Sequence, residues 1–295
     1  GINIEMPDLS SYDLLNAREN LELERSVGLY DNANNAVLDR RLKEKYNTIL
    51  AEVEKGVNTD WLSKPLRTGV GQRYNLRFEG GNEAFRWGAS LGYNTINGAM
   101  KGSDRKTFSG NVTLSYTYRN LIVRNQITID LNKSNESKYG SFSQYARMNP
   151  YYNPKDENGE YVKYFNLKGT DIENPLYNTR LNVIDQKKST AIINNFSIEW
   201  NIMNALKLRG QFGVQKQTST SDNFLPADHT SFKDDTDIFE KGTYDYSTGE
   251  DVNWDANVTL SYSKILGEKH QIYAGVDYSI SQREGHTYYF SAEGF

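Results

Sequence analysis

The sequence predicts an all-β protein, an antiparallel meander that forms part of an outer-membrane β-barrel and follows a short helical or irregular segment. Three observations lead to this fold class. Apolar and polar residues alternate through long hairpins, tight and long connections alternate strictly, and aromatic residues gather near both ends of the apolar face. Side chains alternate between the two faces of a strand, so a period of two indicates a sheet with one apolar and one polar face.

The clearest alternation lies in residues 106–132, on both sides of a short connection at Arg119 and Asn120. Phe108 and Val112 fall on one face of the first arm, and small polar residues fall on the other. Two such runs joined by so short a connection predict an antiparallel hairpin. Each arm has roughly eleven residues, which exceeds the usual five or six and is enough for a tilted transmembrane strand.

The composition excludes several classes of protein. Of the 295 residues only 37% are hydrophobic, and the mean hydropathy is -0.74. No apolar run approaches the roughly 18 residues of a membrane helix, whereas a membrane barrel needs apolar residues on only one face of each strand. The net charge of -4 gives no electrostatic footprint for nucleic acid, and the lack of cysteine excludes disulfides and thiolate chemistry.

Residues 1–66 are predicted to form a helical or irregular segment. Ser10 and Asp13 have the spacing of a capping box, which predicts the start of a helix there. A second run, residues 38–53, has its apolar residues on one helical face and ends before Gly56. We expect this second helix to pack its apolar face on another part of the chain.

Residues 67–295 are predicted to form part of the barrel, with about eight strands in four hairpins. In a meander of antiparallel strands, strictly alternating connections place all tight turns at one end and all long loops at the other. Outer-membrane barrels have this asymmetry, with long extracellular loops. We expect tight turns near residues 82, 119, 204 and 267, and long extracellular loops at 95–105, 132–188 and 216–250.

Aromatic residues on the predicted apolar faces form two groups, with aliphatic residues mostly between them. Two aromatic girdles around an aliphatic band are typical of the two interfaces of a bilayer. The alternative is that tyrosine and tryptophan are simply good strand residues. The group beside the tight turns comprises Phe78, Phe85, Trp87, Tyr116, Tyr118, Trp200 and Tyr262, and the group nearer the long loops comprises Tyr93, Phe108, Trp254 and Tyr278.

Several short segments in a fixed order carry a resemblance to a known family. They are Tyr12–Glu19, Thr59–Leu62, Leu66–Gly69, Asn75–Leu76, Gly80–Gly81, Ser90–Tyr93 and Gly102–Asp104. In these segments the chain resembles the SusC/RagA family of TonB-dependent outer-membrane transporters. The resemblance is dense over residues 11–131, and beyond them it continues in the spacing of the hairpins.

This resemblance implies a barrel of about 22 strands that is closed by an N-terminal plug. It also implies location in the bacterial outer membrane, contact with outer-membrane lipid, a SusD-like surface lipoprotein as a lid, and energy from the TonB complex acting through the plug. The cargo would be an oligosaccharide or a peptide. We expect this chain to be an internal piece that begins after the plug and stops within the barrel.

The residues themselves leave a rival interpretation open. The same strands could form a soluble or surface-exposed β-sandwich that binds glycans, with the apolar strand faces packed into a core. Solubility without detergent separates the two interpretations, because a lipid-facing sheet needs an amphiphile and a sandwich does not.

No set of residues predicts catalysis. His229, His270 and His286 have no spacing that suggests a triad or a metal site. The acidic residues between 234 and 237 could bind calcium, but the glycine that an EF-hand loop requires does not follow them, so a solvated acidic loop is the simpler interpretation. A β-rich hydrolase would need an acid, base or nucleophile set that we do not find. We expect no enzyme activity, no metal site and no cofactor.

The long loop at 132–188 is rich in aromatic residues beside Asn, Asp and Arg. Such rings can stack on sugar faces while the polar side chains bind hydroxyl groups. The alternative is that the rings pack the loop against itself, as in other compact long loops. Both interpretations stay open, and the candidate ligand-binding residues are Tyr145, Tyr151, Tyr152, Tyr161 and Tyr164.

Overall fold

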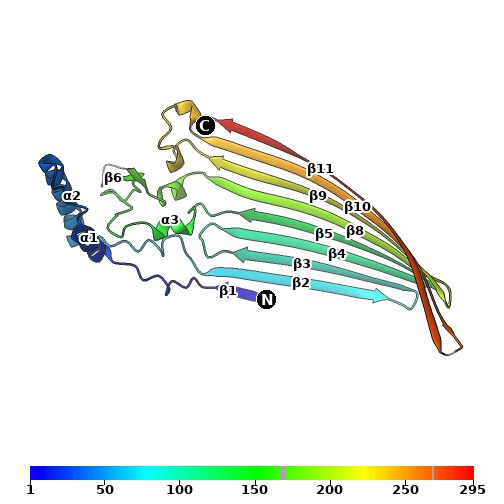
Figure 1. Cartoon of the computed structure of the whole chain (residues 1–295). Helices are drawn as coiled ribbons and strands as arrows, with labels where there is room; N and C mark the ends of the chain where they lie inside the picture. The colour runs from blue at the N-terminus through cyan, green and yellow to red at the C-terminus, as the bar shows by residue number, and fades with distance from the viewer. Residues whose placement is uncertain (167–170, 268) are drawn as a thin grey trace.

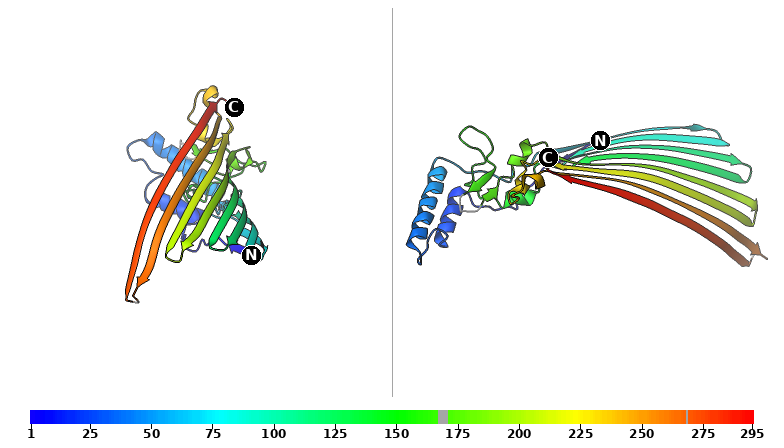
Figure 2. Two further views of the ribbon diagram at one scale, coloured as in Figure 1. Left: turned by 90° about the vertical axis from the view of Figure 1, so that its right-hand side faces the viewer. Right: turned by 90° about the horizontal axis from the view of Figure 1, so that it is seen from above.

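The computed structural model describes residues 1–166, 171–267 and 269–295. It shows one long, curved sheet with the helices and the long loops gathered beyond one end of the strands (Figure 1). Figure 2 shows helices α1 and α2 standing clear of the sheet at this end.

Within the described residues, nine strands form a single antiparallel sheet in the order β1-β2-β3-β4-β5-β8-β9-β10-β11. The sheet is open, with β1 and β11 at its edges. The strands are β1 (Ile2–Glu5), β2 (Gly69–Gly81), β3 (Phe85–Asn97), β4 (Asp104–Tyr118), β5 (Leu121–Asn135), β8 (Ile184–Met203), β9 (Leu206–Leu225), β10 (Thr243–Leu266) and β11 (His270–Glu293). The all-β antiparallel meander predicted from the sequence is confirmed.

The tight turns all lie at the end of the sheet that faces away from the helices (Figure 1). At the β2–β3 turn the side chain of Asn82 accepts hydrogen bonds from the backbone N–H groups of Ala84 and Phe85. At the β4–β5 turn Arg119 has a φ of 52°, in the left-handed region that tight turns require. The four turns predicted from the alternation of connection lengths are therefore at one end, as expected.

Strand β1 differs from the prediction, because it lies in a segment expected to be helical or irregular. It adds to the edge of the sheet by pairing Ile2 with Gln72 and Glu5 with Gly69. Four residues carry too little pattern for a period of two to be recognised, so only the partner strand identifies this segment as a strand.

The long connections are shorter than predicted, at residues 98–103, 136–183 and 226–242, because the strands run on into the expected loops. Strands β8 and β9 have 20 residues each, and β10 and β11 have 24 each. At the loop end of β9 both faces of the strand are polar, in the run from Lys216 to Asn223. A strand with two polar faces has no hydrophobic period, so from sequence it is indistinguishable from a loop.

Helix α1 (Ala17–Ser26) starts later than predicted. Its N-cap is Asn16, which accepts a hydrogen bond from the N–H of Glu19, while the Glu19 carboxylate accepts one from the N–H of Asn16. The capping box predicted at Ser10 was therefore wrong, and a second box six residues later sets the start. Helix α2 (Ala36–Glu54) follows the predicted span, and Gly56 follows it with a positive φ of 97°.

Six smaller elements lie in the described parts of the long connections. Helix α3 (Phe142–Ala146) and the hairpin of β6 (Tyr164–Asn166) and β7 (Asp171–Glu173) lie in the 136–183 connection. Short 3-10 helices follow at η1 (Tyr177–Arg180), η2 (Thr230–Phe232) and η3 (Ile238–Glu240).

One face of the sheet, which we call the apolar face, carries most of the apolar residues of the long strands. The register places them side by side, so that Trp87 is opposite Leu114 and Phe108 is opposite Leu131. These residues are exposed rather than covered, and Val276 on β11 reaches 70% exposure. The opposite, polar face carries Thr113, Gln126 and their equivalents.

The register also places the aromatic residues. Tyr93 lies opposite Phe108 on the loop side of the apolar face, and Phe85 lies opposite Tyr116 on the turn side. Tyr278 is an exception to the predicted grouping. It pairs with Val258, which lies four residues closer to the tight turn of β10 than Trp254 does. The strand is longer than expected, which places Tyr278 nearer the turn than the sequence suggested.

The buried hydrophobic core lies outside the sheet. None of the buried hydrophobic side chains among the described residues belongs to the nine-stranded sheet, and no second sheet among these residues covers its apolar face. A β-sandwich requires such a covering layer. The core instead fills the region of helices and loops, which we call the cap and define as residues 6–68, 136–183 and 226–242, as far as they are described.

No helix within the described residues is long and apolar enough to cross a membrane.

Candidate functional site

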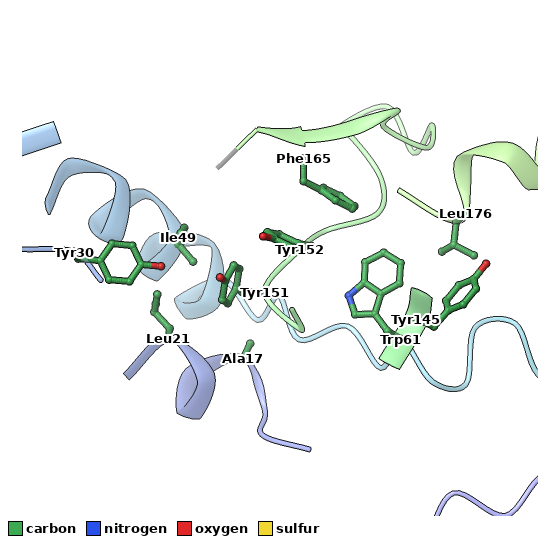
Figure 3. Packing of buried hydrophobic residues seen from close by; sticks show 10 residues of the cluster. All are labelled: Ala17, Leu21, Tyr30, Ile49, Trp61, Tyr145, Tyr151, Tyr152, Phe165 and Leu176. Atoms are coloured by element: carbon green, nitrogen blue, oxygen red, sulfur yellow. The ribbon is translucent and has the colours of Figure 1, made fainter. Parts of the chain in front are cut away.

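The cap is built around a cluster of aromatic rings from distant parts of the chain (Figure 3). Tyr152 stacks on Phe165, with ring centroids 4.8 Å apart and planes inclined by 6°. Trp61 meets the same Phe165 edge-on at 5.9 Å and lies 6.4 Å from Tyr145. Aromatic pairs at these separations are worth about 0.5–1.5 kcal/mol each beyond the area that they bury.

Hydrogen bonds fasten the segment before β2 to the 136–183 connection. The indole Nε1 of Trp61 donates to the carbonyl of Asn149 at 2.9 Å. Thr59 donates its backbone N–H to the carbonyl of Pro150 at 2.7 Å and its hydroxyl to the carbonyl of Tyr152 at 2.8 Å. These bonds hold the tyrosine-rich stretch of the loop against the N-terminal part of the cap.

Tyr151 joins this stretch to helix α1 through a carboxylate. Its hydroxyl donates to Glu24, 3.0 Å from both carboxylate oxygens, and Tyr30 donates to the same group at 2.6 Å. Burial raises the pKa of the Tyr151 phenol, and that of Tyr30 as well, with the neighbouring carboxylate adding to both shifts. Both phenols are therefore neutral donors at physiological pH.

A second network connects the two long loops. Asp228 accepts a hydrogen bond from Tyr177 and forms an ion pair with Lys163, whose Nζ is 2.7 Å from the carboxylate. The fully buried Thr230 donates to Glu173 at 3.0 Å and accepts from the side chain of Asn178 at 2.8 Å. The pKa of the Asp228 carboxyl lies below its usual value. Burial alone would raise this pKa, but the hydrogen bonds from Lys163 and Tyr177 stabilise the carboxylate and outweigh the effect of burial.

Two of the hollows among the described residues lie in the cap. The larger, of about 630 Å³, is a groove between residues 9–16, helix α1, residues 58–62 and residues 146–150. Its lining combines exposed apolar side chains such as Tyr12 and Leu14 with amides and with Arg147.

The other hollow, of about 530 Å³, lies between the two long loops. It is lined by the cations Lys138, Arg147 and Lys233 and by the carboxylates Asp171 and Glu173. His229 also lines it, and burial lowers the pKa of this imidazole. The mixture of both charges with backbone and amide groups suits a ligand that carries charges of both signs.

The five tyrosines proposed as ligand-binding residues divide into two groups. Tyr145, Tyr151 and Tyr152 are almost completely buried in the aromatic cluster, as the packing interpretation requires. Tyr161 and Tyr164 are partly buried, with the ammonium groups of Lys155 and Lys163 over their rings at 5.1 and 5.7 Å. Ligand binding by any of the five stays a prediction.

The described part of the chain holds no group of three or more His, Cys, Asp or Glu side chains that could bind a metal ion. Asp237, one of the acidic residues considered for calcium, accepts a hydrogen bond from the N–H of Phe239 at 2.9 Å and so caps η3. His229 similarly caps η2, accepting from the N–H of Ser231. His270 and His286 both lie on β11, far along the strand from one another.

Sequence reasoning missed the residues that organise the cap, chiefly Glu24, Asn149 and Asp228. Tyr151 and Glu24 are 127 positions apart, and Tyr177 and Asp228 are 51 apart. No local pattern joins residues so distant, so the sequence offered no signal for these contacts.

No family model matches the sequence, and no curated protein matches it either. Among solved structures, a chain of the RagAB peptide transporter superposes with a TM-score of 0.78 at 19% sequence identity. A chain of the RagAB peptide importer in the "closed-closed" state gives 0.79 at 20% identity. In both cases the similarity covers all of this chain and 35% of the other. The chain thus spans about a third of these transporter chains and has the fold of that part of them.

Proposed function

We propose that this chain forms part of the wall and the external loops of an outer-membrane transporter that imports peptides or oligosaccharides. The observation that carries the proposal is the long antiparallel meander with an exposed, continuous apolar face that contributes nothing to the core. Exposed apolar areas of this extent mark a membrane or a large interface. The similarity in fold to a segment of the RagAB chains supports the same interpretation.

In this proposal the tight turns face the periplasm and the cap lies outside the cell, the orientation that outer-membrane barrels adopt. Outer-membrane lipid contacts the apolar face, and the polar face lines the interior. A SusD-like surface lipoprotein covers the cap, and the TonB complex supplies energy through a plug. The bacterial outer membrane is the location that follows, and nucleic acid is not a partner.

Between the two cargo classes, we favour peptides. The hollow between the long loops offers three cations and two carboxylates, which match the charged ends and side chains of a peptide better than an uncharged sugar. The solved structures with the same fold are described as those of a peptide transporter and a peptide importer. Transport moves the cargo without breaking bonds, so we propose no enzyme activity and no cofactor.

Uptake by living cells tests this proposal. Cells with and without the gene would receive the same labelled peptide mixture and the same labelled oligosaccharide mixture, and internalised label would be counted with and without a protonophore. We expect peptide uptake that depends on both the gene and the proton gradient. Gene-independent uptake of both mixtures would contradict the proposal, and so would release of the protein from cells without detergent.

A further inference from the structure

Three lysines form an unbroken row across the apolar face. Lys106 on β4 is directly opposite Lys133 on β5, and Lys133 is directly opposite Lys188 on β8. All three are exposed. Directly opposed residues of an antiparallel sheet have Cβ atoms about 4.5–5.5 Å apart, so the three ammonium groups share a small area.

This row lies at the loop-side boundary of the apolar face. On the same face, the next positions towards the tight turns are Phe108 on β4 and Leu131 on β5, which pair with each other. Beyond them come Val112 and Ile127, which also pair. Lys106 and Lys133 therefore stand immediately above apolar residues of the same face, and Lys188 stands above Thr190, with Ile192 next along β8.

The lysines have no acidic partner in the sheet. Within the described residues none of the three forms an ion pair or a side-chain hydrogen bond, whereas Lys216 on the next strand is paired with Glu250 at 2.8 Å. The acid nearest to them along β4, Asp104, is already bound by the side-chain amide of Asn135 at 3.0 and 3.1 Å. Like charges directly opposite one another destabilise a sheet, so the row leaves repulsion that an external anion would relieve.

From this arrangement we infer that Lys106, Lys133 and Lys188 bind the phosphate of an anionic lipid whose acyl chains lie on the apolar face below. The commitment to a lipid comes from the continuity of the two surfaces, because a free phosphate would use the cations and leave Phe108 and Leu131 unused. Basic side chains beside an apolar membrane surface bind anionic head groups electrostatically. This inference rests on the proposed function, since it requires the apolar face to meet lipid.

The test uses the protein purified from membranes in detergent and titrated with fluorescently labelled phosphatidic acid. We expect saturable binding, and a combined Lys106→Gln, Lys133→Gln, Lys188→Gln variant should bind about a hundredfold more weakly, at roughly a factor of five for each lysine. Glutamine is polar, is only one atom shorter than lysine and removes the repulsion within the row, so folding is not at risk. Phosphatidylcholine, which carries no net charge, should bind equally weakly to both proteins.

The matched control removes charge from the other face of the same strands. Arg105 and Lys187 are adjacent in sequence to Lys106 and Lys188, are equally exposed, and point to the polar face. The Arg105→Gln, Lys187→Gln variant should bind phosphatidic acid as the unaltered protein does. Equal losses in the two variants would show a general charge effect and overturn the inference.

Further outcomes show whether the phosphate comes from a lipid or from a free anion. They also show whether a failure concerns the lysine site alone or the proposed function as well. Displacement of the labelled lipid by millimolar inorganic phosphate alone would overturn the lipid assignment in favour of a free anion. If all variants fractionate with the outer membrane and bind the lipid equally, the lysine site is wrong and the proposed function stands. If the unaltered protein leaves the membrane without detergent, both are wrong.

Discussion

The sheet and the cap are stabilised in opposite ways. The sheet has strands of up to 24 residues, complete ladders of cross-strand pairs and an exposed apolar face, but it contributes no buried hydrophobic side chain. The cap has helices and loops and contains the whole of the described aromatic core. The cap is thus organised by burial away from water, whereas the sheet has the hydrogen bonds of a β-structure and an apolar face that no other described part of the chain covers.

The comparison predicts that the same kind of substitution has different consequences in the two regions. Replacing Trp61 with alanine should destabilise the cap by about 3–5 kcal/mol, because the change opens a cavity among Tyr145 and Phe165. It also removes the indole hydrogen bond to Asn149. Amide hydrogen exchange of residues 136–166 in detergent-solubilised protein should report the loss as faster exchange.

Trp87→Ala is the matched control for this change. Trp87 lies on the apolar face, where it is 41% exposed. Removing it deletes the same side chain from the sheet, and exchange in the cap should stay as in the unaltered protein. If Trp87→Ala loosened the cap as much as Trp61→Ala, the two regions would not be independently stabilised.

A charge on the apolar face should have the next largest effect, and only in a bilayer. Val112→Arg is expected to destabilise the membrane-inserted protein by about 2–4 kcal/mol, because it places a guanidinium in hydrocarbon. Thr113→Arg, on the polar face of the same strand, should cost much less. Reversible unfolding in urea from lipid vesicles would measure both, and equal costs would remove the assignment of the two faces.

The strand pattern of the sheet could be predicted from sequence because its information is local. The alternation around Phe108 and Val112 predicted which residues lie on each face of the sheet. The short Arg119–Asn120 connection predicted that β4 and β5 pair as antiparallel neighbours. Where both faces turn polar, as after Lys216, the local signal ends although the ladder continues as far as Leu225. The loop boundaries were misplaced for this reason.

The cap could not be predicted because its information is distributed. Two capping boxes compete before α1, and the burial of Ala17 and Leu21 against the rest of the cap is what selects the later one. The loop tyrosines fit ring packing and sugar stacking equally well in the sequence. Only their partners, among them Glu24 and Trp61, show which rings are enclosed.

The Glu24 carboxylate, which accepts hydrogen bonds from both Tyr151 and Tyr30, allows a test of the cap with a smaller expected effect. Tyr151→Phe keeps the ring and removes one donor to Glu24, so we expect a loss of about 1.5–3 kcal/mol, the usual range for a hydrogen bond to a charged group. Tyr30→Phe should do the same, and the double variant should lose more than the sum, because it leaves the carboxylate without either phenol. Thermal unfolding followed by near-UV circular dichroism measures all three. Strict additivity would mean that the two phenols act independently.

The smallest expected effect is a pH dependence confined to the cap. Burial holds the pKa of His229 below its ordinary value of 6.5, with the Glu173 carboxylate partly opposing the shift. The unfolded chain therefore takes up a proton at 6.5 while the folded loop does not. The loop is fully stable above that pH and loses stability as the pH falls below it. The pKa of Asp228 lies below 3.8, so its contribution disappears only in a separate, more acidic range.

Limited proteolysis of residues 226–242 at pH 5.0 and 7.5 would detect this dependence. We expect faster cleavage at the lower pH in the unaltered protein. His229→Asn should cleave at similar rates at both values, because asparagine keeps the acceptor that caps η2 and cannot titrate. The β4–β5 turn at Arg119 and Asn120 serves as the internal reference, since it contains neither a histidine nor a carboxylate. A turn that became equally sensitive to acid would mean that the sheet and the cap respond as one unit, against the comparison drawn from their packing.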